Sequence, residues 1–325
     1  MQGSLASLAL TDLVLLKPLA KTLRRDRRSF GTLGSISLEL ISAEMVRRFV
    51  TTCPGLSVSE TLSACSSLRE LRVSAAWSDN DEVARISQAE AEAVWSFDAS
   101  FTKLESLFVK ANDFALVGEF FRNVIASGVR SATSLEISDT SGNISSAFMR
   151  DLAHSLADTA PAPTLDRLHI VQCLDWYAFE PILDWDDLAT ATKRWRGGAA
   201  FFRALPRLRE LSFDGLANSL EPYLDACPPT LERFSFAFTA ENEDRAHGLA
   251  RTLSKWVATR GKDSRIRRID FAVAYGMPAP SESDDEAVAH HSGAVKALEP
   301  PEALLQLCSA AGIKLVRKNT SRRSL

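Results

Sequence analysis

A short apolar pattern recurs along the chain: an apolar residue, two others, an apolar residue, one other, and a third apolar residue. Copies begin at Leu33, Leu68, Leu104, Ala132, Leu165, Leu208, Leu231 and Ile266. Their spacing varies from 23 residues (Leu208 to Leu231) to 43 residues (Leu165 to Leu208). The alternation at the end of each copy predicts a strand with one buried face. Residues 313–316 are a degenerate ninth copy.

Helical periodicity fills several of the intervals between these predicted strands. Ser42 is placed to cap a helix, and Asn242 to cap another that ends near Gly261. Further helices are predicted after Asp113, after Ser145 or Ser146 and after Pro301. Strands that alternate with helices favour parallel pairing through right-handed crossovers.

The predicted fold is therefore α/β, an irregular leucine-rich-repeat solenoid with a curved parallel sheet and helical crossovers. A strand-plus-helix unit cannot bury its apolar face alone, and stacking the units produces one continuous core. We expect an N-terminal capping helix region (1–32), a repeat domain (33–316) and a basic tail (317–325). Within the repeat domain, 174–205 is an aromatic insertion and 276–301 a flexible acidic loop.

The amino-acid sequences of three segments resemble those of a known group of proteins. Cys65-Ser-Ser-Leu-Arg-Glu-Leu-Arg-Val, Cys227-Pro-Pro-Thr-Leu-Glu-Arg-Phe-Ser-Phe and Leu307-Cys-Ser-Ala-Ala-Gly-Ile-Lys-Leu-Val are similar to the repeat region of fungal F-box/leucine-rich-repeat proteins. The resemblance covers residues 33–316. It implies that the repeats bind a substrate protein while an F-box recruits a ubiquitin-ligase adaptor. Residues 1–30 show no F-box-like Leu-Pro start, so an F-box here would be divergent or missing.

Two surfaces are predicted to bind a partner protein. The residue between the last two apolar positions of each copy should face the concave side of the sheet, in a row from Ser37 to Asp270. Aromatic residues with nearby aspartates in 175–202 are typical of interface anchors. The predicted protein-binding residues are Arg72, Phe108, Glu136, His169, Trp176, Tyr177, Trp185, Ser212, Arg233 and Asp270. Trp195, Phe201 and Phe202 are instead expected to pack in the core.

One catalytic alternative remains open. Glu136, His169 and Ser212 follow one another in the concave row and have the composition of a hydrolytic triad. An ordinary polar binding face explains the same residues, and the sequence contains no P-loop, HExxH or GxSxG motif. We therefore expect a non-catalytic scaffold with no cofactor. The further alternative is a substrate receptor of a cullin-RING ubiquitin ligase.

Charge and cysteine content limit the classes of partner and the cellular compartment expected for this chain. The formal net charge is −3, and arginines on the late strands alternate with acids, which argues against a nucleic-acid partner. No apolar run is long enough to predict a membrane partner or span. The five cysteines include no CxxC pair, so we expect no metal site and free thiols in a reducing cytoplasmic or nuclear setting. Cys65, Cys173, Cys227 and Cys308 are expected to be buried.

Overall fold

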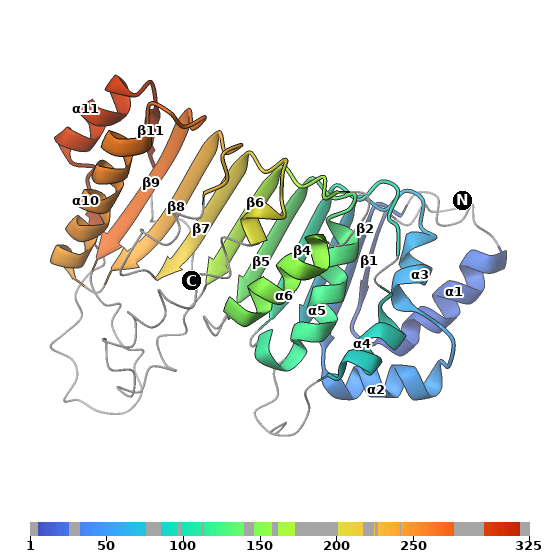
Figure 1. The fold of residues 1–325 in the computed structure, drawn as a ribbon. Helices are drawn as coiled ribbons and strands as arrows, with labels where there is room; N and C mark the ends of the chain where they lie inside the picture. The colour runs from blue at the N-terminus through green and yellow to red at the C-terminus, as the bar shows by residue number, and fades with distance from the viewer. Residues whose placement is uncertain are drawn as a thin grey trace, which may run out of the picture. The chain divides into compact units, whose positions relative to one another are not determined.

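The computed structural model describes residues 6–25, 33–75, 86–96, 99–111, 114–139, 146–157, 162–172, 201–216, 224, 227–240, 242–275 and 296–318. The fold is α/β, and the strands are mostly parallel, as the alternation of strand and helix patterns predicts (Figure 1). The chain divides into two compact units. Unit 1 comprises 1–178 and 197–208, and unit 2 comprises 179–196 and 209–325.

Unit 1 contains six parallel strands whose order in the sheet follows the order in the chain. They are β1 (Ser7–Leu10), β2 (Ser35–Ile41), β3 (Glu70–Ala75), β4 (Ser106–Ala111), β5 (Ser134–Asp139) and β6 (Arg167–Gln172). Its helices are η1 (Leu13–Leu15), α1 (Leu16–Arg25), α2 (Ala43–Thr52), α3 (Val58–Ser63), α4 (Gln88–Val94), α5 (Phe114–Gly128) and α6 (Ser146–Ala157).

Unit 2 contains β7 (Glu210–Leu216), β8 (Arg233–Ala240), β9 (Arg268–Tyr275), β10 (Lys296–Leu298) and β11 (Lys314–Arg317). Strands β7, β8 and β9 are parallel neighbours, and β11 also pairs in parallel with β9. The exception is β10, which is antiparallel to β9. Its helices are α10 (Glu243–Arg260) and α11 (Glu302–Ala310).

Strands β2 to β6 in unit 1, and β8 and β9 in unit 2, begin with the same backbone arrangement. The carbonyl of Arg69 accepts hydrogen bonds from the N–H groups of Glu105 and Ser106, at 2.8 and 2.9 Å. The carbonyls of Ala6, Gly34, Glu105 and Thr133 in unit 1, and of Arg209 and Glu232 in unit 2, also each accept two successive N–H groups from the next strand. The donors always lie between the first and second apolar positions of the repeated pattern. This paired hydrogen bond aligns the copies, so their apolar positions fall opposite one another.

The aligned apolar positions form the core. Leu71, Leu107 and Leu135 are successive partners in the sheet, and Val73, Val109 and Ile137 form the next row. All six are at most 1% exposed. In unit 2 the first row is Leu211, Phe234 and Ile269, and the second row is Phe213, Phe236 and Phe271. The rings of Phe236 and Phe271 meet edge to face at a centroid distance of 5.4 Å, and both are fully buried. The period-2 pattern therefore predicted the buried side of the strands correctly.

A buried polar network joins the helices of unit 1 behind the sheet. Trp95 is fully buried, and its Nε1 donates to Ser127 Oγ of α5 at 2.8 Å. The Ser96 N–H donates to Ser59 Oγ of α3, and Asn123 Nδ2 donates to the Trp95 carbonyl. These contacts satisfy polar groups that would otherwise be buried without partners.

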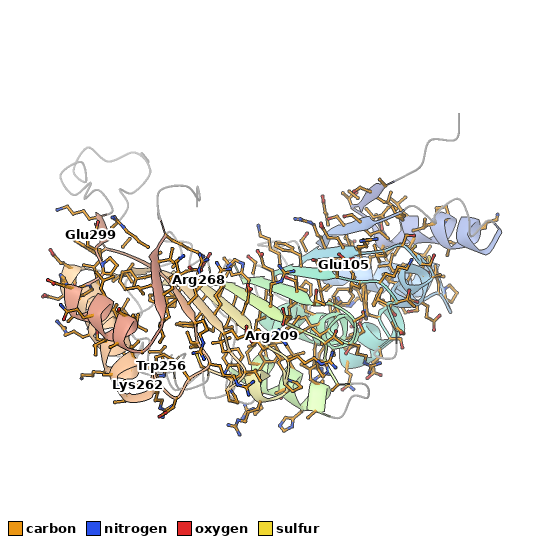
Figure 2. All side chains as sticks on the ribbon, turned by 90° about the horizontal axis from the view of Figure 1, so that it is seen from above. Glu105, Arg209, Trp256, Lys262, Arg268 and Glu299 are labelled. Carbon is orange, nitrogen blue, oxygen red and sulfur yellow. The ribbon has the colours of Figure 1, made fainter. Side chains whose placement is uncertain are left out.

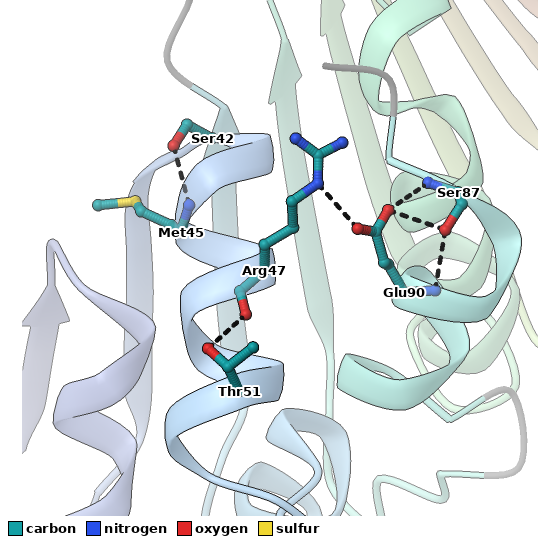
Figure 3. Close-up of polar contacts among 6 residues, drawn as sticks. All are labelled: Ser42, Met45, Arg47, Thr51, Ser87 and Glu90. Carbon is teal, nitrogen blue, oxygen red and sulfur yellow. Dashed lines mark hydrogen bonds and ion pairs between the residues drawn. The ribbon is translucent and has the colours of Figure 1, made fainter. Parts of the chain in front are cut away.

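Helix ends in unit 1 are fixed by side-chain caps (Figure 3). The Met45 N–H donates to Ser42 Oγ at the start of α2, as predicted. Ser87 and Glu90 form a capping box on α4, which the Ser-x-x-Glu spacing could have predicted. Hydrogen bonds from the Ser87 backbone and hydroxyl, followed by the nearby Arg47, hold the pKa of Glu90 below its usual range. Arg47 of α2 donates to Glu90 at 2.8 Å, so the same carboxylate also joins two helices.

Three boundaries differ from the predicted ones. Ser7–Leu10 is a strand, although residues 1–32 were expected to form a helical cap. The pattern also fits Leu5, Leu8 and Leu10, so a further copy was missed there. Residues 296–298 of the expected flexible loop form β10, because they pair with β9. Finally, Arg317 ends β11 and the Lys318 N–H donates to the Phe271 carbonyl, so the last described residues belong to the sheet and not to a basic tail.

Two glycines of α5 provide a test of this packing. A Cβ on Gly128 would lie 2.6 Å from Leu107 Cδ2, whereas a Cβ on Gly118 would have Phe148 Cδ2 as its nearest neighbour at 3.5 Å. Overpacking costs about 1–3 kcal/mol, and alanine gains about 1 kcal/mol in a helix. We expect Gly128→Ala to lower the free energy of unfolding by up to about 2 kcal/mol. Gly118→Ala should leave it unchanged or raise it by up to about 1 kcal/mol, both measured by urea denaturation. Equal effects of the two substitutions would contradict the packing described for α5.

Candidate functional site: the open face

Each unit has one sheet face covered by helices and one that carries the polar positions of the strands. In unit 1, α5 packs against β4, and in unit 2, α10 packs against β8 and β9. Figure 2 shows Arg268 of β9 on the opposite side of the sheet from Trp256 of α10. We call the side away from the helices the open face. Because side chains alternate along a strand, the residue between the two buried apolar positions lies there.

The row predicted from the sequence is present in unit 1. Ser37, Arg72, Phe108, Glu136 and His169 are successive partners across β2 to β6. The Arg72 guanidinium lies over the Phe108 ring, 5.3 Å from its centroid, and Arg72 Nε also donates to Glu70 at 2.6 Å. His169 Nδ1 lies 3.1 Å from Glu136 Oε2. The row thus presents a cation on an aromatic ring next to an acid–imidazole pair, and 52% of the Arg72 side chain is exposed.

The hydrolytic alternative requires Ser212 beside that pair. Ser212 belongs to unit 2, where its neighbour in the sheet is Ser235. Neither unit by itself contains the complete set of Glu136, His169 and Ser212. The arrangement within unit 1 is a contact between a carboxylate and an imidazole.

The row of unit 2 is organised around a buried carboxylate. Asp270 is 0% exposed, and both of its oxygens are occupied. Arg233 donates through Nε and Nη2 to Oδ2, at 2.8 and 2.5 Å, and Arg268 donates through Nε to Oδ1 at 2.6 Å. Burial alone would raise the pKa of Asp270, but hydrogen bonds and positive charge from Arg268 and Arg233 outweigh it and hold the pKa below its usual range. Asp270 was predicted to contact a partner, whereas its burial makes it the group that positions two arginines.

Strand β11 contributes basic residues that the sequence analysis did not select. Lys314 is the register partner of Arg268, and Lys318 Nζ reaches across β9 to Ser235 Oγ at 2.7 Å. Both were assigned to a degenerate strand or to the tail. The alternation Lys314, Val316, Lys318 is the signal that places them on one face of a strand.

The remaining predicted site residues, Trp176, Tyr177 and Trp185, lie outside the described residues, as do Cys173 and Trp195. The core prediction is confirmed for Phe201 and Phe202, which are 0% and 1% exposed. Within the part of the chain that the structure describes, no group of three or more metal-binding side chains occurs. Among the described helices, none is both long enough and apolar enough to cross a membrane.

The described cysteines are free thiols. Cys53, Cys65 and Cys308 are buried, as expected for the last two, whereas Cys227 is partly exposed. Burial raises the pKa of both the Cys65 and the Cys308 thiol to about 11. These two groups therefore remain protonated at neutral pH and act as small apolar side chains.

No model of a known protein family matches the chain. No curated protein matches it either.

Removal of the buried carboxylate should destabilise unit 2. In Asp270→Asn, two arginines lose their anionic partner, but each is partly exposed and can be resolvated. We expect a loss of about 2–3 kcal/mol in the free energy of unfolding at neutral pH. The folded pKa of Asp270 lies below the ordinary value of 3.8, so its contribution is present above that pH and disappears as pH falls through the folded pKa. The difference between wild type and Asp270→Asn should therefore shrink as pH falls below 3.8, measured by urea denaturation at several pH values. A difference that does not change with pH would contradict the ion-pair description.

Thiol reactivity should separate the cysteines by burial. With a thiol-specific colorimetric reagent at pH near 8, Cys227 should react well before Cys65 and Cys308, because only the exposed thiolate reacts quickly. Single Cys→Ser variants identify the fast group. In denaturant all thiols should react at similar rates. Early reaction of Cys65 in the folded protein would contradict the buried position described for its thiol.

Proposed function

We propose that this chain is a non-catalytic protein-binding scaffold, a leucine-rich-repeat-like arc that contacts its partner through the open face. The observation that carries the proposal is the row of unit 1. Five consecutive parallel strands present, at one register position, side chains of different chemistry that are partly exposed. A face with these properties suits recognition of another protein better than burial within the fold.

The repeated strand entry supports a repeat architecture. The same pair of hydrogen bonds occurs at successive strands in each unit, and it lies at the same place in the apolar pattern. Consecutive strands are neighbours, and the connecting helices cover the side away from the row (Figure 1). Stacked strand-plus-helix units are the basis of solenoids, which expose an extended binding surface.

The side chains of the row are already held in place, which favours affinity. Arg72 is fixed between Glu70 and the Phe108 ring, and the Glu136–His169 contact limits both side chains. Side chains that are ordered before binding lose less conformational entropy when a partner docks. Arginine and aromatic residues are also the types most often found as energetic anchors of interfaces.

The test compares partner capture by three versions of the tagged full chain in extract from its native cells. They are the wild type, the open-face variant Arg72→Glu/Phe108→Ala, and a control, Arg150→Glu/Leu15→Ala. The control makes the same change of charge in α6 and also truncates one apolar side chain in η1, where Arg150 is exposed and Leu15 is 48% exposed.

We expect one protein to be recovered with the wild type and the control but lost with the open-face variant. With that protein purified, the Kd of the open-face variant should rise at least about tenfold, equivalent to about 1.4 kcal/mol. Equal recovery by all three versions, or equal loss in the control, would refute a binding role for the row. Thermal unfolding of each variant confirms that it is folded.

A further inference from the structure

Basic side chains line up on the open face of unit 2. Arg233 opens β8, Arg268 opens β9 and Lys314 opens β11, and the three are register partners across adjacent strands. Neighbouring strands are about 4.8 Å apart, so the three Cα atoms span about 10 Å. Lys318 lies four residues beyond Lys314 and reaches back over β9 to Ser235. We call Arg233, Arg268, Lys314 and Lys318 the basic cluster.

Asp270 fixes the geometry of this cluster from beneath. Its oxygens hold Nε and Nη2 of Arg233 and Nε of Arg268, while the carboxylate itself is fully buried. The arginine side chains above it remain 35% and 41% exposed. Among the described residues, Asp270 is the only ion-pair partner of Arg268. Arg268 donates to it through Nε alone, so the two terminal amino groups of Arg268 are left for a further acceptor. A guanidinium held in place by one buried acid is prepared to bind a second, external one.

The charges on this part of the face do not cancel. Strands β8, β9 and β11 carry the four cations of the basic cluster against one carboxylate, Asp270. On the described strands of unit 2, the other acids of this face are Glu210 and Asp214 of β7, and Glu210 Oε2 is 3.6 Å from Arg233 Nη1. The open face of unit 2 is therefore acidic at β7 and basic from β8 to β11. A ligand with negative charge would be drawn to the basic side.

The size and surroundings of the cluster favour a peptide over a nucleic acid. A phosphate backbone is a continuous line of charge, and it would meet Glu210 and Asp214 immediately beside the cluster. A span of about 10 Å matches three residues of extended peptide, at about 3.3 Å each. A peptide can therefore place two or three carboxylates over the cluster and continue with uncharged residues.

We propose that the basic cluster binds an acidic segment of the partner protein, with glutamate or aspartate carboxylates accepting hydrogen bonds from Arg268, Lys314 and Lys318. This inference rests on the proposed protein-binding function. It extends that function by naming the chemistry of one contact. It also assigns Asp270 a positioning role, since it orients the two arginines and does not touch the ligand.

The test measures fluorescence anisotropy of short labelled peptides added to the purified full chain. One peptide has glutamate at alternate positions with serine or glycine between, and the matched peptide has glutamine in place of each glutamate. The variants are Arg268→Gln/Lys314→Gln and the single change Lys314→Glu, which leaves the Asp270 hydrogen bonds intact. The control, Arg251→Gln/Lys262→Gln, removes two exposed positive charges on and just after α10, away from the open face.

We expect the glutamate peptide to bind the wild type and the control, and to bind at least about tenfold more weakly to both cluster variants. Affinity should also fall as salt rises from about 0.05 M to about 0.3 M, because part of each contact is exposed. Equal binding of the glutamine peptide, or equal weakening in the control, would overturn the proposal. So would tighter binding of a single-stranded oligonucleotide that depends on the same residues.

The outcome is separable from that of the proposed function. If the peptide fails while partner capture still depends on Arg72 and Phe108, the acidic-segment inference is wrong and the scaffold function stands. If capture is insensitive to the row of unit 1 but the peptide binds as expected, the basic cluster is a site in its own right and the row is not.

Discussion

The paired hydrogen bond at the start of β2 to β6, and of β8 and β9, is the constraint on which the rest of the structure depends. One carbonyl accepts two successive N–H groups from the next strand, at Ala6, Gly34, Arg69, Glu105 and Thr133 in unit 1 and again at Arg209 and Glu232 in unit 2. This contact sets the register before any side chain is considered. Once the register is set, side chains at alternate positions of each strand point to opposite faces of the sheet. One set packs against the helices and the other lies on the open face.

Much of the fold follows from the sequence because the pattern and the backbone contact coincide. The donors always occupy the two places between the first and second apolar positions, so reading the apolar pattern locates the strands. Ser42 and Asn242 were found because a cap needs a side-chain oxygen at one defined position. The strand Ser7–Leu10 was missed because it has only four residues, too few to show a clear period. Strand β10 was missed because three residues are too few to show a period.

The sequence predicted which residues of the candidate site lie in one row, but not their burial or their contacts with one another. Register alone identifies which side chains share a row, and Arg72, Phe108, Glu136 and His169 do so. It does not reveal burial, so Asp270 was taken for a surface group although two arginines enclose it. Lys314 and Lys318 were not predicted as site residues. Their strand, β11, pairs with β9, which lies far from it in the chain. Long-range pairing of this kind leaves no periodic signal in the sequence.

The strand-entry contact also bears on how such a chain can change over generations. It connects only the first residues of one strand to those of the strand before it, so the length of the intervening segment does not enter. Copies 23 residues apart (Leu208 to Leu231) and 36 residues apart (Leu68 to Leu104) both make this contact. Insertions can accumulate after a strand without moving any other strand, and duplication of one strand-plus-helix unit would widen the sheet by about 4.8 Å. The open face can thus be lengthened or shortened one unit at a time.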